Sequence, residues 1–274
     1  MTAHDVPVQR WRRGAAWAVD QDGVAREEPL EIRVNGRSIA VVMRSPGHER
    51  EHAVGFLLTE GVVRSAEDLL DVLLCRDLPS GQSGNVVDVL LAPRVVVDLE
   101  RLTRHVFSGS SCGICGKATL DALALAFPPI TTRHRVDPNA LARWPDRLRA
   151  AQPDFDRTGG VHASALIDAD DRVVAVREDI GRHNAVDKLL GFAVLEGALP
   201  LERHALMLSG RISFELVQKA LAAGIGLVAG VGAPSSLALD CAERSGITVV
   251  GFVRADRFNV YCHPERVGSP APVP

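Results

Sequence analysis

The chain has 274 residues, of which 46% are hydrophobic and 24% are charged, and its formal net charge is −3. This composition is sufficient for a sizeable core, and the slightly negative charge argues against a nucleic-acid-binding protein. No uncharged apolar stretch reaches the length of a membrane-spanning helix, and the apolar run 14–19 is too short for a signal-peptide core, so we expect a cytoplasmic protein without a membrane partner.

The length predicts about two domains. In the first half, the segment Glu31–Met43 reads as two strands joined by a type I′ turn at Asn35-Gly36. Ser45-Pro46 then opens a helical stretch that ends at Gly61. We therefore predict an N-terminal extension (1–30), a small α+β unit (31–107), an α/β domain (108–266) and a short, Pro-rich, disordered tail (267–274).

A glycine- and serine-rich loop at 108–117 places two cysteines, Cys112 and Cys115, directly before a predicted helix over 118–127. A helix N-terminus and the nearby cation Lys117 both favour the thiolate form, so this pair is suited to sulfur chemistry. Two other interpretations are a structural zinc site, which needs further ligands, and a disulfide in a secreted protein. The odd number of cysteines and the lack of a second CxxC pair weigh against both, and we expect Cys75, Cys241 and Cys262 to be structural.

The second half begins with a capped helix (137–151) and then alternates strands with helices. The predicted helices are 184–196, 214–223 and 235–245, and the predicted strands are 163–167, 173–176, 205–208, 225–231 and 247–253. The last three strands with their helices form a β-α-β-α-β run, which builds a parallel sheet and places ligands beyond the carboxyl ends of its strands.

Polar, glycine-rich segments follow three of these strands, at 209–213, 232–236 and 254–259. They provide two helix starts and three arginines, which suits an anionic, phosphate-bearing ligand. Ordinary helix capping and surface arginines would explain each segment taken singly. Neither a GxGxxG nor a Walker A sequence occurs, so the chain supports neither NAD nor a P-loop nucleotide.

Two more polar clusters interrupt apolar sequence, at 158–162 and 178–184, and Asp187 and Lys188 follow the second one. A carboxylate beside His183 could orient the imidazole as an acid, a base or a ligand. A helix start with surface charges is the alternative for His183.

These motifs, from Cys112-Gly113-Ile114-Cys115 through the charged run 178–188 to the segment 254–261, resemble those of the FdhD family of formate dehydrogenase accessory sulfurtransferases. The resemblance implies an enzyme that takes persulfide sulfur from a cysteine desulfurase and passes it to the molybdenum bis-molybdopterin guanine dinucleotide cofactor of formate dehydrogenase. It also implies a homodimer, a cytidine-deaminase-like three-layer α/β fold, and a nucleotide site that would bind GDP or GMP as analogues. Matching the family's motifs predicts these cofactor-binding residues: Phe252, Val253, Arg254, Ala255, Asp256 and Arg257, with His162, Ser209 and Arg211 as further contributors.

We expect Cys112 to attack the persulfide as a thiolate and to hold the sulfur, with Cys115 relaying it, discharging it through a disulfide or tuning the first thiol. A thiol oxidoreductase and a zinc-binding module are the competing functions. A deaminase-type zinc hydrolase would need an HxE upstream of its cysteines. The HxE of this chain, at His263, lies downstream, and we predict no metal site.

Overall fold

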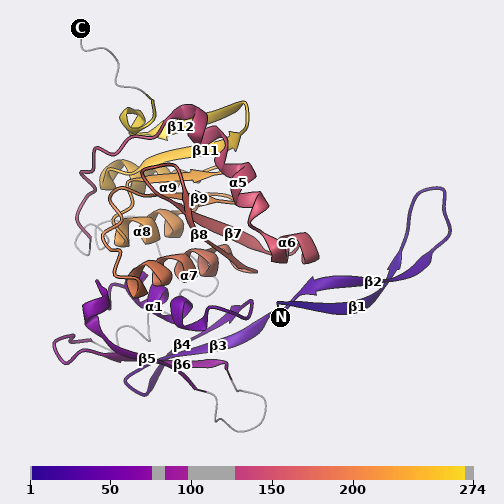
Figure 1. Cartoon of the computed structure of the whole chain (residues 1–274), viewed down its shortest axis with the longest axis horizontal. Helices are drawn as coiled ribbons and strands as arrows, with labels where there is room; N and C mark the ends of the chain where they lie inside the picture. The colour runs from indigo at the N-terminus through magenta and orange to yellow at the C-terminus, as the bar shows by residue number, and fades with distance from the viewer. Residues whose placement is uncertain (1, 76–83, 98–126, 269–274) are drawn as a thin grey trace.

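The computed structural model describes residues 2–75, 84–97 and 127–268, which form three β-sheets and several helices (Figure 1). The predicted helix at 118–127 lies outside the described residues except for its last position, and so does most of the tail. No helix of the described part of the chain is long and apolar enough to cross a membrane. The mixed α/β class predicted from the sequence is confirmed.

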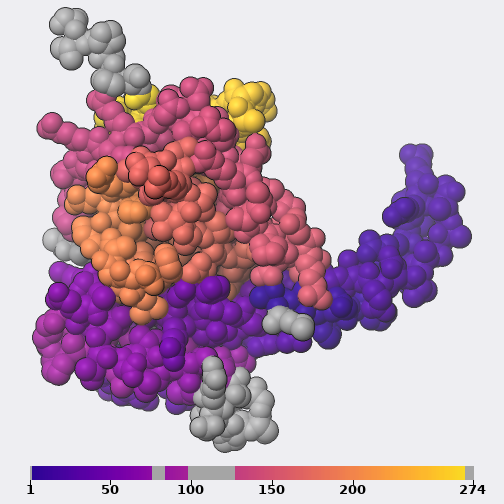
Figure 2. All heavy atoms as spheres, viewed as in Figure 1, coloured from indigo at the N-terminus to yellow at the C-terminus, as the bar shows by residue number. Residues whose placement is uncertain are grey.

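The predicted extension 1–30 contains a hairpin that the sequence analysis did not foresee. Strands β1 (Ala3–Arg10) and β2 (Ala18–Ala25) pair with each other in an antiparallel, two-stranded sheet. The hairpin projects from the body of the molecule (Figures 1 and 2). Near its base, Asp5 forms an exposed ion pair with Arg157 of helix α6 (Pro153–Thr158), and its tip leaves Trp11 and Trp17 exposed.

The second sheet follows the predicted hairpin, with strand order β4-β3-β6-β5. Strands β3 (Glu28–Val34) and β4 (Arg37–Arg44) are joined at Asn35 and Gly36, whose φ angles of 49° and 80° are those that a type I′ turn requires. Strands β5 (Leu69–Cys75) and β6 (Val86–Leu91) complete the sheet. Alternate residues of β3 are buried against helix α1 (Glu49–Thr59), which begins after the predicted Ser45-Pro46 signal.

The third sheet has six strands in the order β12-β11-β10-β9-β7-β8. The strands β9 (Ala205–Leu208), β10 (Leu227–Gly230) and β11 (Thr248–Arg254) run parallel, as predicted. Strands β7 (His162–Ile167) and β12 (Arg257–Cys262) run against their neighbours, and β8 (Val173–Asp179) pairs antiparallel with β7. The sequence analysis did not predict β12.

Helices cover both faces of this sheet, because alternate strand residues point to opposite sides. Leu206 and Leu208 belong to the cluster on the side of helices α7 (Arg182–Leu195), α8 (Phe214–Ala222) and α9 (Ser236–Ser245). Ala205 and Met207 belong to the cluster that contains Trp144 on the opposite side. The described part of the domain therefore has three layers.

The predicted helix at 137–151 is divided in two. Helices α4 (Pro138–Ala142) and α5 (Trp144–Ala150) meet at Arg143. Pro145 explains the division, because it has no N–H to donate to the carbonyl of Leu141 and its ring would collide with that carbonyl in a continuous helix.

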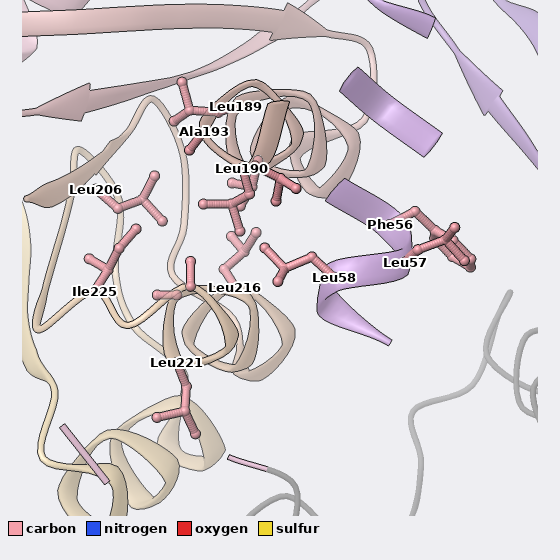
Figure 3. Packing of buried hydrophobic residues seen from close by; sticks show 14 of the residues in the cluster. Phe56, Leu57, Leu58, Leu189, Leu190, Ala193, Leu206, Leu216, Leu221 and Ile225 are labelled. Carbon is pink, nitrogen blue, oxygen red and sulfur yellow. The ribbon is translucent and has the colours of Figure 1, made fainter. Parts of the chain in front are cut away.

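The helices α1 and α7 cross at a very short distance in the interior. A Cβ atom added to Gly55 would lie 1.8 Å from the carbonyl oxygen of Asp187, and one added to Gly191 would lie 1.7 Å from that of Glu51. The crossing brings Leu58 of α1, Leu190 of α7 and Leu216 of α8 into one core (Figure 3). That core takes side chains from both sides of the predicted domain boundary at 107.

We predict that Gly191→Ala lowers the free energy of unfolding by about 3 kcal/mol, since the two helix backbones must separate to admit a methyl group. Alanine favours an isolated helix by about 1 kcal/mol over glycine, so a loss would report the crossing and not helix propensity. Chemical denaturation measures the change. Arg50→Ala, at an exposed position of α1, is the control and should change stability by less than about 0.5 kcal/mol. Equal stability of the two variants would contradict the prediction.

Candidate functional site

The predicted ligand segments meet at one edge of the six-stranded sheet. The carboxyl ends of β8, β9, β10 and β11 and the amino ends of β7 and β12 all lie there, as the pairing directions require. The segments that follow β9, β10 and β11 are therefore neighbours in space. His162, at the start of β7, belongs to the same edge.

Glycines allow the two central loops to touch through their backbones. Gly232 donates its N–H to the carbonyl of Gly210 at 2.9 Å. A Cβ atom on Gly232 would lie 2.8 Å from the backbone nitrogen of Arg211. Ser235 caps α9 by accepting a hydrogen bond from the N–H of Ala238. The helix start is thus held in place at this edge, and its remaining N–H groups favour an anion.

A hollow of about 190 Å³ lies where β11 and β12 meet, lined by Phe252, Arg254, Arg257 and Asn259. Phe252 has a left-handed backbone (φ 55°), and its side chain is 42% exposed. Arg254 donates hydrogen bonds to the carbonyls of Val231 (2.9 Å) and Val253 (2.7 Å), which fix its guanidinium. We call these four residues the β11–β12 corner.

The other predicted residues of this segment have different positions. Val253 is buried in the core cluster beside α5, so only its backbone is available to a ligand. Ala255 and Asp256 form the exposed turn between β11 and β12. Asp256 lies 3.4 Å from Arg257, an exposed pair of little energetic weight. Asn259 lines the hollow although the resemblance did not single it out as a contact.

A second group of polar residues lies further along the edge and includes His162, Ser209 and Arg211. The Ser209 hydroxyl accepts a hydrogen bond from the N–H of Ala163 at 2.9 Å, which ties the loop after β9 to β7. A Cβ atom on Gly210 would lie 3.3 Å from Nδ1 of His162. The structure therefore brings these three predicted residues together, several strands away from the β11–β12 corner.

Much of the charged run 178–188 makes structural contacts. The Glu178 carboxylate accepts hydrogen bonds from the N–H groups of Asp154 and Phe155, both at 2.9 Å, at the start of α6. Two ion pairs of the run are buried: Asp179 with Lys188 and Asp187 with Lys219, each at 2.7 Å.

Arg182 and His183 are the members of the run that reach the open edge. Nε2 of His183 lies 3.3 Å from the Ser213 hydroxyl and 3.7 Å from the Glu215 carboxylate. Burial, together with the charges of Lys219 and Arg182, lowers the pKa of His183 to about 4. Burial and the charges of Arg182 and Arg211 also lower the pKa of His162. Both imidazoles are therefore neutral near neutral pH.

Cys112 and Cys115 lie outside the described residues. Among the residues that the structure describes, no three His, Cys, Asp or Glu side chains gather in a group that could hold a metal ion. Cys241 and Cys262 are buried, and desolvation raises the pKa of Cys241 and raises that of Cys262 to about 11. Such thiols are unreactive, which agrees with the structural role predicted for these two.

Comparison with known proteins identifies relatives along almost the whole chain. The sequence model of the FdhD/NarQ family matches residues 25–268, so it begins at the last residue of β2. Proteins named sulfur carrier protein FdhD are 49% identical over 264 residues in Streptomyces avermitilis (93% of this chain, 92% of the relative) and 50% identical over 251 residues in Mycobacterium tuberculosis (89% and 91%).

A solved structure has the same fold. It is a crystal structure from Desulfotalea psychrophila, described as a formate dehydrogenase accessory protein, with a TM-score of 0.78 and 27% identity. The match covers 97% of this chain and 100% of that one.

We predict that Arg182→Gln raises the pKa of His183, because the Arg182 charge opposes protonation of the imidazole. A titration followed by imidazole NMR signals measures the shift. Arg172→Gln, at an exposed arginine that pairs with Asp170, is the control and should leave the His183 pKa unchanged. An unaltered His183 titration in Arg182→Gln would show that these side chains do not face each other.

Proposed function

Because this chain belongs to the FdhD/NarQ family, we propose that it accepts persulfide sulfur from a cysteine desulfurase and passes it to a molybdenum bis-molybdopterin guanine dinucleotide cofactor. Its relatives are named sulfur carrier proteins, and the matching crystal structure is described as a formate dehydrogenase accessory protein, so the chain is a sulfur carrier of this class. The proposal includes action in the cytoplasm, formate dehydrogenase as the recipient of the cofactor, a homodimer and a kinship of fold with cytidine deaminases.

Sulfur transfer to the chain is assigned to Cys112, assisted by Cys115. The Cys112 thiolate attacks the terminal sulfur of the donor persulfide; a new S–S bond forms, the donor S–S bond breaks, and the donor cysteine leaves as a thiolate. The reaction needs no external oxidant, since one persulfide is exchanged for another. A lowered thiol pKa increases the fraction of Cys112 that can attack.

The guanine nucleotide part of the cofactor is assigned to the β11–β12 corner, and this corner is the observation that carries the proposal. Phe252 offers an exposed aromatic face on which a base can stack. Arg257 is exposed, and its weak surface pair with Asp256 can be exchanged for a phosphate, whereas Arg254 is held against the carbonyl of Val231. A guanidinium recognises phosphate through two parallel hydrogen bonds. Ser209, Arg211 and His162 are proposed to bind the same ligand further along the edge.

We predict that the chain binds GDP and that Arg257→Gln weakens this binding about tenfold, the loss of one charge-assisted phosphate contact. Calorimetric titration measures the affinity. Arg172→Gln removes an arginine elsewhere on the surface and should bind GDP like the original chain. No detectable GDP binding by the unmodified chain would overturn the assignment of the corner.

We predict that incubation with a cysteine desulfurase and cysteine adds one sulfur atom to the chain, detected by intact-mass analysis. The Cys112→Ala, Cys115→Ala double variant should gain none, since the remaining described cysteines are half-buried or buried. Cys75→Ala serves as the control and should load normally. Persulfide that persists in the double variant would assign the chemistry to another thiol.

A further inference from the structure

Arg182 differs from the other charged residues of the run 178–188 because it has no structural partner among the described residues. Glu178, Asp179, Asp187 and Lys188 each have structural partners, as do the neighbouring Asn184 and Arg177. Arg182, by contrast, makes no hydrogen bond or ion pair within the described part of the chain, and its Nε atom is buried without a partner. A desolvated donor without a partner is unfavourable, which indicates that Arg182 is placed for something other than the fold.

A second unpaired arginine lies close by. Arg211, in the loop after β9, is exposed and has no carboxylate partner among the described residues. His162 of β7 lies between the two arginines: it pairs with Asp179, three residues before Arg182, and a Cβ atom on Gly210, next to Arg211, would lie 3.3 Å from its Nδ1. Two arginines from separate elements thus flank the same imidazole, and the charges of both lower its pKa.

The remaining charges around this group leave it positive. Glu215 contributes one carboxylate, 3.7 Å from His183. Lys219 is engaged with Asp187 at 2.7 Å, and Asp179 is engaged with Lys188. His162 and His183 are neutral and supply hydrogen-bonding nitrogens without charge. Among the residues that the structure describes, one carboxylate, Glu215, whose pKa the charge of Arg182 helps to lower, therefore faces two arginines that form no ion pair.

We propose that Arg182, Arg211, His162 and His183 form a second anion-binding subsite, separate from the β11–β12 corner. The inference rests on the proposed function, in which the ligand is elongated and carries several anionic groups. The strand β8, which ends just before Arg182, is four strands from β11, a spacing of roughly 20 Å, and Arg211 lies between them, in the loop after β9 and two strands from β11. One ligand can then be held at two anionic points along the sheet edge.

The two guanidinium groups of the subsite would bind a small anion. Guanidinium groups bind oxyanions through paired N–H donors, and they also attract a sulfur anion through charge alone. A phosphate of the nucleotide and a sulfur anion at the other end of the cofactor are both possible sources. They are distinguished by comparing inorganic phosphate with thiosulfate, which carries a terminal sulfur.

The test is a titration of the full chain with inorganic phosphate in the presence of saturating GDP, followed by the imidazole NMR signals of His162 and His183. We expect both signals to shift although GDP occupies the corner. Arg182→Gln should weaken phosphate binding at least tenfold and leave GDP affinity within about threefold. Arg257→Gln should show the reverse pattern, and Arg172→Gln should show neither effect. Tighter binding of thiosulfate than of phosphate would assign the subsite to sulfur, and the opposite order to phosphate.

Two results would overturn the second subsite: imidazole signals that do not respond once GDP is bound, or an Arg182→Gln variant that loses GDP and phosphate affinity equally. The second result would mean that one site spans the whole edge. Failure of GDP to bind would reject the corner instead. The phosphate titration without GDP would still report on Arg182, so the two proposals fail separately.

Discussion

The buried ion pair between Asp179 and Lys188 is the interaction on which the arrangement of the sheet edge depends. Its atoms lie 2.7 Å apart, and both side chains are at most 1% exposed. Removing either partner would leave an uncompensated buried charge, which is strongly destabilising. Asp179 also accepts hydrogen bonds from the backbone N–H groups of Ser45 and Gly181, and Lys188 donates to the carbonyl of Ser45. The pair therefore joins β8 and α7 to the connection between β4 and α1.

Three residues near this pair, Arg177, Glu178 and Asp187, hold the helices α1, α6 and α8 in position. Arg177 binds Glu51 of α1 through two hydrogen bonds of 2.5 and 2.8 Å. Burial raises the pKa of Glu51, but the hydrogen bonds and charges of Arg177 and His48 outweigh burial and lower the pKa to about 2. Glu178 holds the start of α6, which in turn carries the N-terminal hairpin. Asp187 pairs with Lys219 of α8. Because the α1–α7 crossing leaves no room for displacement at Gly55 and Gly191, the first turn of α7 has a fixed position beside the loop after β9.

The fold could be predicted from the sequence where buried elements carry a clear pattern of apolar residues. All residues of β9 and β10 and the first four residues of β11 are buried, and their short runs of mostly apolar residues are typical of buried parallel strands. The β1–β2 hairpin was missed because its strands bury little and therefore lack an apolar pattern. In the charged run, residue type alone cannot separate the buried Lys188 from the half-exposed Arg182, since the difference arises from partners supplied by Ser45 and Asp179. The segment of the β11–β12 corner was singled out by its polar residues after a strand and by the family resemblance; no sequence pattern indicates the left-handed backbone of Phe252.

Positive charge is concentrated at this edge of the six-stranded sheet. The whole chain has a net charge of −3, yet Arg182, Arg211 and Arg257 stand at one edge of one sheet, where Glu215 and Asp256 are the facing carboxylates. Lys188 and Lys219 are engaged in ion pairs, whereas the arginines of the edge stay charged at any physiological pH. Burial is the main cause of the lowered pKa values of His162 and His183, and nearby charges add to it: Arg182 and Arg211 at His162, and Lys219 and Arg182 at His183. In the proposed function, this row of fixed cations and neutral imidazoles attracts a polyanionic ligand and aligns it along the ends of the strands, and we expect the attraction to change little across the pH range in which the histidines stay neutral.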